Sequence, residues 1–336
     1  MSGLQSVYGL RIAAEVPLPG LPIQSGTRPD VQIRLRDRSL LPAGAPISSD
    51  RILYVSPVLD ERGDPNLTVA RLAQNDSVAF FYSDGARFIV DRLGREVCAD
   101  WPDKFTLEDA CTYLLGPVIA FVLRLRGVTC LHASSVVVDG RAIVLFGPAG
   151  AGKSTTAAAF ALKGYSVLSD DVAVLADLGD RFLVQPGYPR INLWRDSVRT
   201  LFGSEDALPR ITPTWEKRYL ALDQNKLRFQ SSPLPLGAIY ILGEREAELT
   251  APVIEEVVGG EAIMALVANT YVNYLLDRDM RKREFDVLSR LLPGVPVRRV
   301  RPAADTSKIF ALCERIAADA TQLAWPDATR AALGAH

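Results

Sequence analysis

One octapeptide of this chain carries a specific signature: Gly147-Pro148-Ala149-Gly150-Ala151-Gly152-Lys153-Ser154. It matches the P-loop pattern G-x-x-x-x-G-K-[ST] at every fixed position. The flanks fit as well, because the apolar run 142–146 predicts a strand entering the loop and the alanine-rich run 155–163 predicts a helix leaving it. Gly164 stands where such a helix would end. We therefore expect an α/β fold built around a strand, a glycine-rich loop and a helix.

The chemistry of such a loop is the binding of phosphate groups. Phosphate oxygens need several backbone N–H donors at close range, which glycines permit, and the helix N-terminus adds partial positive charge. Lys153 would neutralise β- and γ-phosphate oxygens, and Ser154 would bind Mg²⁺. The alternative is a glycine turn that binds nothing, which the flanking strand and helix disfavour. The predicted nucleotide-binding residues are Gly147, Gly150, Ala151, Gly152, Lys153, Ser154 and Thr155.

A β-hairpin is predicted directly before this loop, with Asp139-Gly140 as its two-residue turn. Such a turn fixes the register, so residues that face each other have numbers that sum to 279. His132 then faces Gly147, beside the predicted phosphates. The sequence holds 2 histidines, and the other is the terminal His336. A purely structural role at a strand end is the alternative for His132.

A pair of carboxylates, Asp170-Asp171, follows the next strand-like run at 165–169. As the strand after the loop's helix, this run belongs to a right-handed β-α-β unit and ends at the same sheet edge as the loop. One carboxylate there can take a proton from an attacking hydroxyl, and the other can hold Mg²⁺. The alternative is an aspartate pair that only starts a turn.

Three cations further along are weaker candidates for contacts with phosphate or substrate: Arg190, Lys217 and Arg218. Positive charge aimed at a phosphoryl group would stabilise its transfer. Solvated surface charge is the alternative for each of the three residues.

The pattern changes near residue 105, where we place a domain boundary. Residues 1–104 are β-rich, with a predicted strand at 31–35 and a predicted hairpin of 78–82 with 87–90. Thr106 is a helix N-cap candidate, Pro117 predicts a kink and Gly127 a helix end. The second domain spans 105–325, and 326–336 reads as a loose tail. Its further predicted strands are 134–138, 165–169, 172–176, 181–184 and 237–242, and its later predicted helices are 261–276, 278–292 and 306–319.

Composition excludes several classes of protein. The 336 residues carry 38 Lys and Arg against 39 Asp and Glu, so the net charge of −1 argues against nucleic-acid binding. The apolar stretch Tyr113–Leu125 is too short to span a membrane, and residues 1–20 lack a signal-peptide pattern. These patterns favour a cytoplasmic protein with reduced thiols, because the cysteines show no metal-ligand spacing: Cys98, Cys111, Cys130 and Cys313.

His132, the loop and Asp170-Asp171 together resemble the catalytic domain of the HPr kinase/phosphorylase family. The resemblance covers residues 128–180 and continues weakly to 245. It implies a nucleotide-binding core like that of phosphoenolpyruvate carboxykinase, and a homo-oligomer. It also implies that Asp170 is the base that activates a serine hydroxyl, that His132 assists at the transferred phosphate, and that Asp171 supports the Mg²⁺ site.

The chain departs from that family at two places. Thr155 stands where the family usually has an acidic residue, and residues 186–194 replace a later family signature. It looks more like the stand-alone HPr-kinase-like proteins of lasso-peptide clusters, some of which phosphorylate a serine of the precursor peptide. We therefore predict a kinase that uses ATP and Mg²⁺ on a peptide or small protein, with residues 1–104 helping to recognise the acceptor. A small-molecule kinase and a non-catalytic, nucleotide-gated regulator are the alternatives.

Overall fold

The computed structural model describes residues 3–37, 51–72, 76–224 and 226–323, so the predicted tail at 326–336 lies outside it. Its contacts divide the chain into two compact units. The first consists of Met1–Val128, Thr212–Trp215 and Val272–Arg281, and the second of Thr129–Ile211, Glu216–Tyr271 and Lys282–His336. The sequence led us to expect a division near residue 105. In the structure, the helical segment that follows residue 105 packs within the first unit.

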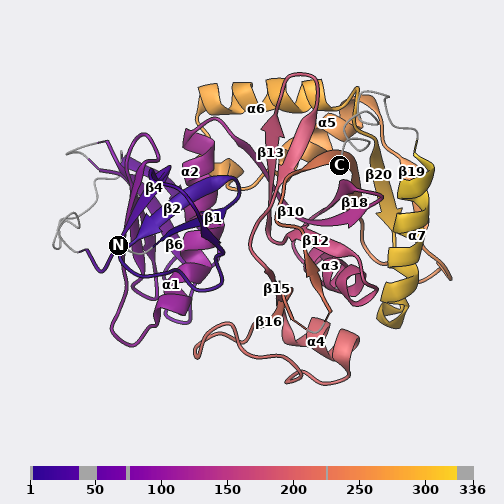
Figure 1. The fold of residues 1–336 in the computed structure, drawn as a ribbon, viewed down its shortest axis with the longest axis horizontal. Coiled ribbons are helices and arrows are strands. Elements are labelled where there is room, and N and C mark those ends of the chain that lie inside the picture. Colours follow the sequence, from indigo (N-terminus) through magenta and orange to yellow (C-terminus); the bar gives the residue numbers. More distant parts are fainter. Residues whose placement is uncertain (1–2, 38–50, 73–75, 225, 324–336) are drawn as a thin grey trace. The chain divides into compact units, whose positions relative to one another are not determined.

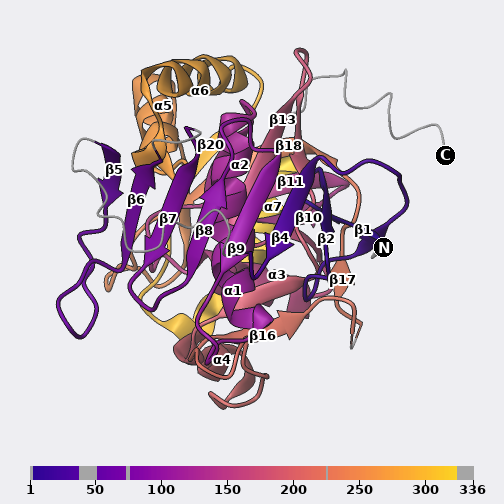
Figure 2. The same cartoon turned by 90° about the vertical axis from the view of Figure 1, so that its left-hand side faces the viewer.

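The first unit is built on a sheet of nine strands within the described residues, in the order β3-β1-β2-β4-β9-β8-β7-β6-β5 (Figure 2). The predicted strand at 31–35 and the predicted hairpin are confirmed as β4 and β7–β8. The strands are β1 (Leu4–Val7), β2 (Leu10–Ala14), β3 (Ile23–Gln24), β4 (Val31–Leu35), β5 (Ile52–Val55), β6 (Leu67–Arg71), β7 (Val78–Tyr82), β8 (Arg87–Val90) and β9 (Glu96–Asp100).

A kinked helical segment packs on this sheet as α1 (Leu107–Tyr113), η2 (Leu114–Val118) and α2 (Ile119–Leu125). Thr106 caps its start through a capping box with Asp109. The π-helical η2 contains Pro117, whose missing N–H interrupts the regular ladder, and Gly127 follows the segment with φ +77°. The Phe121 ring lies 5.6 Å from the Phe80 ring of the sheet. Aromatic packing therefore joins the segment to the N-terminal strands.

The second unit holds a mixed sheet in the order β17-β12-β10-β13-β14-β18-β20-β19, with β11 between β10 and β18. A separate ribbon, β15–β16, lies outside it. All strands predicted from 134 to 242 are present. The bounds are β10 (Thr129–Val138), β11 (Arg141–Phe146), β12 (Ser166–Ser169), β13 (Val172–Asp177), β14 (Phe182–Gln185), β15 (Arg190–Leu193), β16 (Arg218–Ala221), β17 (Arg228–Phe229), β18 (Leu234–Leu242), β19 (Val253–Glu256) and β20 (Val297–Arg301).

Helices cover both faces of this sheet, as Figure 1 shows. Ile143 and Leu145 of β11 belong to the core cluster shared with α3 and α7. Val144 and Phe146 belong to the cluster shared with α5 and α6. A strand that is buried on both faces has a continuous apolar sequence, which is why residues 142–146 could be predicted as a strand. The remaining elements are α3 (Lys153–Leu162), α4 (Arg195–Phe202), α5 (Gly259–Ala268), η3 (Asn273–Leu275), α6 (Arg278–Leu291), η4 (Thr306–Lys308) and α7 (Ile309–Gln322).

The β10–β11 hairpin has the register that the sequence predicts. Val138 pairs with Arg141 and Ala133 with Phe146, so paired numbers sum to 279. Asp139 and Gly140 both have positive φ, +48° and +72°, as a type I′ turn requires. The turn chemistry therefore fixes which residues of β10 stand beside the loop after β11.

One predicted helix is wrong in length. The sequence suggested a helix over 261–276, but α5 ends at Ala268. The chain then leaves the helix because Thr270 forms a bridge with Leu131, and the Tyr271 N–H donates to the Cys130 carbonyl. This change of direction brings Tyr271 against β10. The helices predicted at 278–292 and 306–319 are present as α6 and as η4 with α7.

All four cysteines are buried. Among the described residues, no helix combines the length and the apolar character that a membrane crossing requires.

Candidate functional site

The aspartate pair lies between two consecutive strands, β12 and β13, that pair with the same neighbouring strand. β12 and β13 pair one after the other with the same strand β10, through Ser169 with Ser135 and Val172 with His132. Asp170 and Asp171 occupy the break between them. Asp171 has φ +67°, a left-handed conformation that aspartate tolerates better than most residues. β11 and β12 are both antiparallel to β10, so the pair lies at the sheet edge where the glycine-rich loop begins, as predicted.

Asp170 points into the protein and is 6% exposed. Its Oδ1 accepts a hydrogen bond of 2.7 Å from the Ser134 hydroxyl, and its Oδ2 accepts one of 3.0 Å from the Asn192 N–H. Burial raises the pKa of the Asp170 carboxyl, while hydrogen bonds, including one from Ser154, act in the opposite direction. Both oxygens of this carboxylate are therefore engaged by the protein.

Asp171 is oriented by two aromatic side chains. The Tyr271 hydroxyl donates to Asp171 Oδ2 over 3.0 Å, and His132 Nδ1 lies 3.3 Å from Oδ1 and 3.1 Å from the Asp171 carbonyl oxygen. Both neighbours of Nδ1 are acceptors, so Nδ1 carries a proton and Nε2 has the free lone pair in the neutral imidazole. The His132 and Tyr271 rings stack with centroids 5.1 Å apart.

The ionisation of His132 reflects its surroundings. Burial lowers the pKa of the imidazole, and the nearby Asp171 charge opposes this. The His132 side chain nevertheless keeps 34% of its surface exposed, and that of Asp171 keeps 39%. The pair therefore combines a fixed orientation with access from solvent.

The glycine-rich loop has the conformation that its glycines allow. Gly147 has φ +143°, and a Cβ there would lie 2.6 Å from the Leu242 carbonyl oxygen, so no side chain fits. Gly152, with φ +88°, directly precedes α3. Lys153 is 8% exposed and donates to the carbonyls of Gly147 and Pro148 over 2.9 and 3.0 Å. Burial lowers the pKa of Lys153, while Asp171 and Asp170 raise it.

These elements line one open pocket with a volume of about 210 Å³. It lies within the second unit. Its wall contains His132, Ala149, Gly150, Gly152, Lys153, Ser154, Thr155, Asp171, Asn192, Leu193, Trp194, Ser197 and Lys217. Most of the predicted site residues therefore meet at one place. Gly147, Ala151, Asp170, Arg190 and Arg218 do not belong to this lining.

Of the three candidate cations, one reaches the pocket. Lys217 lies on its wall, with Nζ 4.8 Å from the centroid of the Trp194 ring. The Arg190 guanidinium packs over the Tyr219 ring at 4.1 Å. Arg218 is 2% exposed, donates to Asp206 and to the Glu216 carbonyl, and thus holds the fold. The expected contacts of Arg190 and Arg218 with phosphate are not supported by these positions.

Several residues of the pocket wall, and Tyr271 behind it, were not predicted from the sequence. Asn192 and Trp194 come from β15 and the start of α4, outside the main sheet, and no spacing rule links them to the loop. Ser197 lies on α4, and its hydroxyl is 2.7 Å from that of Thr155. Tyr271 had a weak signal, because Thr270 and Val272 beside it are poor helix formers.

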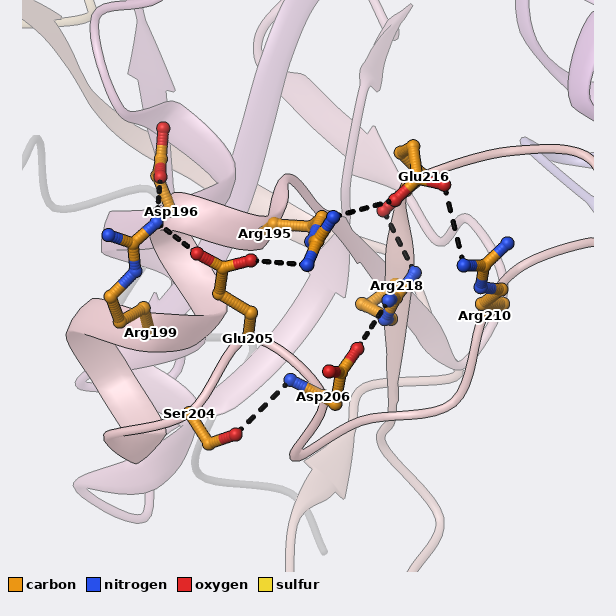
Figure 3. A network of polar contacts seen from close by, with 9 residues as sticks. All are labelled: Arg195, Asp196, Arg199, Ser204, Glu205, Asp206, Arg210, Glu216 and Arg218. Carbon is orange, nitrogen blue, oxygen red and sulfur yellow. Dashed lines mark hydrogen bonds and ion pairs between the residues drawn. The ribbon is translucent and has the colours of Figure 1, made fainter.

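An ion-pair network holds the segment between α4 and β16 (Figure 3). Arg195 bonds Glu205 at 2.5 Å and Glu216 at 3.2 Å, so the first residue of α4 is tied to the chain just before Lys217. The network consists of Arg195, Asp196, Arg199, Ser204, Glu205, Asp206, Arg210, Glu216 and Arg218. Exposed pairs are individually weak, but several charges in one network restrict the geometry of a segment.

The chain is similar to the Hpr(Ser) kinase/phosphatase from Coxiella burnetii, with 14% sequence identity and a TM-score of 0.31, over 58% of this chain and 99% of that chain. No family model matches the chain, and no curated protein does. A similarity of this size assigns no activity, ligand or residue role. The α/β class stands on the chain's own sheets and helices, whereas a core like that of phosphoenolpyruvate carboxykinase stays a prediction.

Proposed function

We propose that this protein is a nucleotide-dependent phosphotransferase. The observation that supports this best is the meeting, in one pocket, of the glycine-rich loop, Lys153 and the Asp171–His132 pair. A helix N-terminus behind glycines is suited to phosphate, and a carboxylate beside it is suited to activating a hydroxyl. A protein that only responds to bound nucleotide would not need this second group.

Lys153 is the cation that meets the phosphates. Its ammonium group now donates to the Gly147 and Pro148 carbonyls. When a phosphate chain binds, the Lys153 ammonium group would donate to charged phosphate oxygens in place of neutral carbonyl oxygens. Hydrogen bonds to charged acceptors are about twice as strong as those between neutral groups. The backbone N–H groups of the loop and of the first turn of α3 would complete the cradle.

Asp171 takes the role of general base in this proposal, and Asp170 supports the site from behind. Asp171 faces the pocket, and His132 and Tyr271 hold its carboxylate in place. Asp170 is buried, and its two oxygens accept hydrogen bonds from Ser134 and Asn192. These positions reverse the roles that the family resemblance implies.

Mg²⁺ would accompany the nucleotide. Among the described residues, no group of three or more His, Cys, Asp or Glu side chains gathers that could hold a metal ion by itself. That fits Mg²⁺, which proteins usually bind through one or two side chains together with substrate phosphates and waters. Ser154 lines the pocket and its side chain hydrogen-bonds Asp170 behind it, so Ser154 would hold the ion and Asp170 would orient that serine. When bound, the ion would neutralise charge on the phosphates.

The proposed reaction is transfer of the γ-phosphate of ATP to a serine hydroxyl of a peptide or small protein. The serine oxygen attacks the γ-phosphorus, the bond to the β-γ bridging oxygen breaks, and the hydroxyl proton passes to Asp171. The choice of ATP and of a peptide serine rests on the resemblance of His132, the loop and the aspartate pair to HPr-kinase-like proteins. The pocket itself supports phosphoryl transfer to a hydroxyl.

Mass spectrometry tests this proposal. The protein is incubated with ATP, Mg²⁺ and each short peptide encoded beside its gene, with Lys153→Ala as the inactive control. The expected result is a phosphoserine on one peptide with the wild type alone. ATP turnover without any peptide product would indicate a small-molecule acceptor. Nucleotide binding without turnover, across peptides and hydroxyl compounds, would contradict a transferase and leave a regulator.

A further inference from the structure

A large aromatic side chain stands exposed on the pocket wall. Trp194 keeps 60% of its surface accessible, although its chain neighbour Leu193 is 1% exposed. It is the N-cap residue of α4, with extended φ/ψ of −72° and 156°. A ligand that covered this indole would gain the free energy of burying its apolar surface. Its position in the pocket points to a ligand as the cover.

The position of this indole is fixed from outside the pocket. Arg195, the next residue, pairs with Glu216, the residue before Lys217, at 3.2 Å. The ammonium group of Lys217 in turn lies 4.8 Å from the centre of the Trp194 ring. The antiparallel pairing of β15 with β16, which ends at Leu193 and Arg218, already brings these two residues together, and the ion pair between their neighbours, drawn in Figure 3, adds to it. Contacts within the protein that hold a side chain in place reduce the cost of ordering it when a ligand binds.

Trp194 and the reactive pair come from different elements of the pocket wall: Trp194 precedes α4, whereas His132 lies on β10 and Asp171 lies between β12 and β13. Asp171 and His132 define where the γ-phosphate must lie, because the base has to meet the attacking hydroxyl there. Thr155 follows Ser154 along α3, and its hydroxyl lies 2.7 Å from Ser197, which is one helical turn after Trp194. A nucleotide with its phosphates on the loop therefore extends its nucleoside toward α4.

We propose that Trp194 is the platform on which the nucleobase stacks, with Lys217 supplying positive charge beside it. This inference rests on the proposed phosphotransferase function and names the group that lies against Trp194 in the same pocket. Every nucleobase has a flat π-face that fits an indole, so the platform favours nucleotides over bare phosphate chains without selecting one base.

Binding calorimetry with two probes tests the platform. Mg·ADP carries a base, whereas inorganic tripolyphosphate with Mg²⁺ offers phosphates alone. Trp194→Ala should weaken Mg·ADP binding roughly tenfold to a hundredfold and leave tripolyphosphate binding unchanged. Trp194→Phe should restore most of the Mg·ADP affinity, since it keeps an aromatic face. Phe285→Ala is the matched control, because Phe285 is 51% exposed on α6 and does not line the pocket.

The outcomes separate this inference from the proposed function. Unchanged Mg·ADP affinity in Trp194→Ala, or an equal loss for both probes, would overturn the platform while the phosphate site stands. If the wild type binds neither probe, the proposed function fails and this inference fails with it. A selective loss of Mg·ADP affinity, rescued by phenylalanine, supports both.

Discussion

Replacement of Asp171 by asparagine and of Asp170 by alanine should give opposite phenotypes. Asp171→Asn should keep the fold, because asparagine also tolerates the positive φ of residue 171, this side chain is 39% exposed, and its amide oxygen can still accept from Tyr271. We expect a change of at most about 1 kcal/mol in the free energy of unfolding. Turnover should fall at least about a hundredfold, since a positioned base contributes that much or more. Nucleotide affinity should remain.

Asp170→Ala should act mainly on stability. It removes the acceptor of the Ser134 hydroxyl and of the Asn192 N–H, both bonded at 3.0 Å or less. Each donor left unsatisfied in the interior costs about 1–3 kcal/mol, so the loss should be at least about 2 kcal/mol. Asp170→Asn preserves the shape and one acceptor, and it should retain measurable turnover because Asp171 is still present.

Urea denaturation followed by circular dichroism gives the stabilities, and ATP turnover with an acceptor gives the rates. The reasoning is refuted if Asp170→Ala is as stable as Asp171→Asn. It is also refuted if Asp171→Asn keeps the wild-type rate while Asp170→Asn loses it, which would restore the roles that the family resemblance implies.

Three further predictions concern the loop and the histidine. Lys153→Ala should weaken Mg·ATP binding and abolish transfer, measured by calorimetry and turnover, and normal transfer would contradict the role of Lys153. Gly147→Ala should destabilise the protein more than Gly150→Ala in urea melts. Both glycines have positive φ, so alanine is strained at either position. A Cβ at Gly147 would lie 2.6 Å from the Leu242 carbonyl oxygen, whereas a Cβ at Gly150 would have no atom within 4 Å. Equal losses of stability would contradict the close approach at Gly147. His132 has a pKa below its ordinary 6.5 in the fold, so the unfolded chain binds the extra proton and stability falls as pH drops through and below 6.5. His132→Gln should lose this part of the pH dependence in urea titrations between pH 5 and 7.5, and identical profiles would contradict the lowered pKa.

Local chemistry explains what could be predicted from the sequence. The Asp139-Gly140 turn needs two residues with positive φ, and it alone set the register of the β10–β11 hairpin. The Thr106 cap, the Pro117 kink and the strand before Gly147 are likewise decided by a few adjacent residues. These features survive folding because neighbouring residues, rather than distant ones, determine them.

Distant contacts explain what the sequence could not give. Asp170 is buried against Ser134 and Asn192, which lie 36 and 22 residues away in the sequence. The sequence therefore could not show which aspartate of the pair faces the pocket. Tyr271 reaches the site only because the chain leaves α5 early to pair with β10. Trp194 stands beside Lys217 in the pocket wall because β15 pairs with β16, where Leu193 is opposite Arg218.

A crystal structure of the protein with Mg²⁺ and a non-hydrolysable ATP analogue tests the central claim most directly. The account predicts the phosphate chain on the backbone N–H groups of residues 147–154, with Lys153 Nζ moved from its two carbonyl partners to the phosphates. The terminal phosphate should lie on the Asp171 and His132 side of the pocket. A nucleotide bound elsewhere, or phosphates in the pocket with Lys153 still bonded to Gly147 and Pro148, would contradict it.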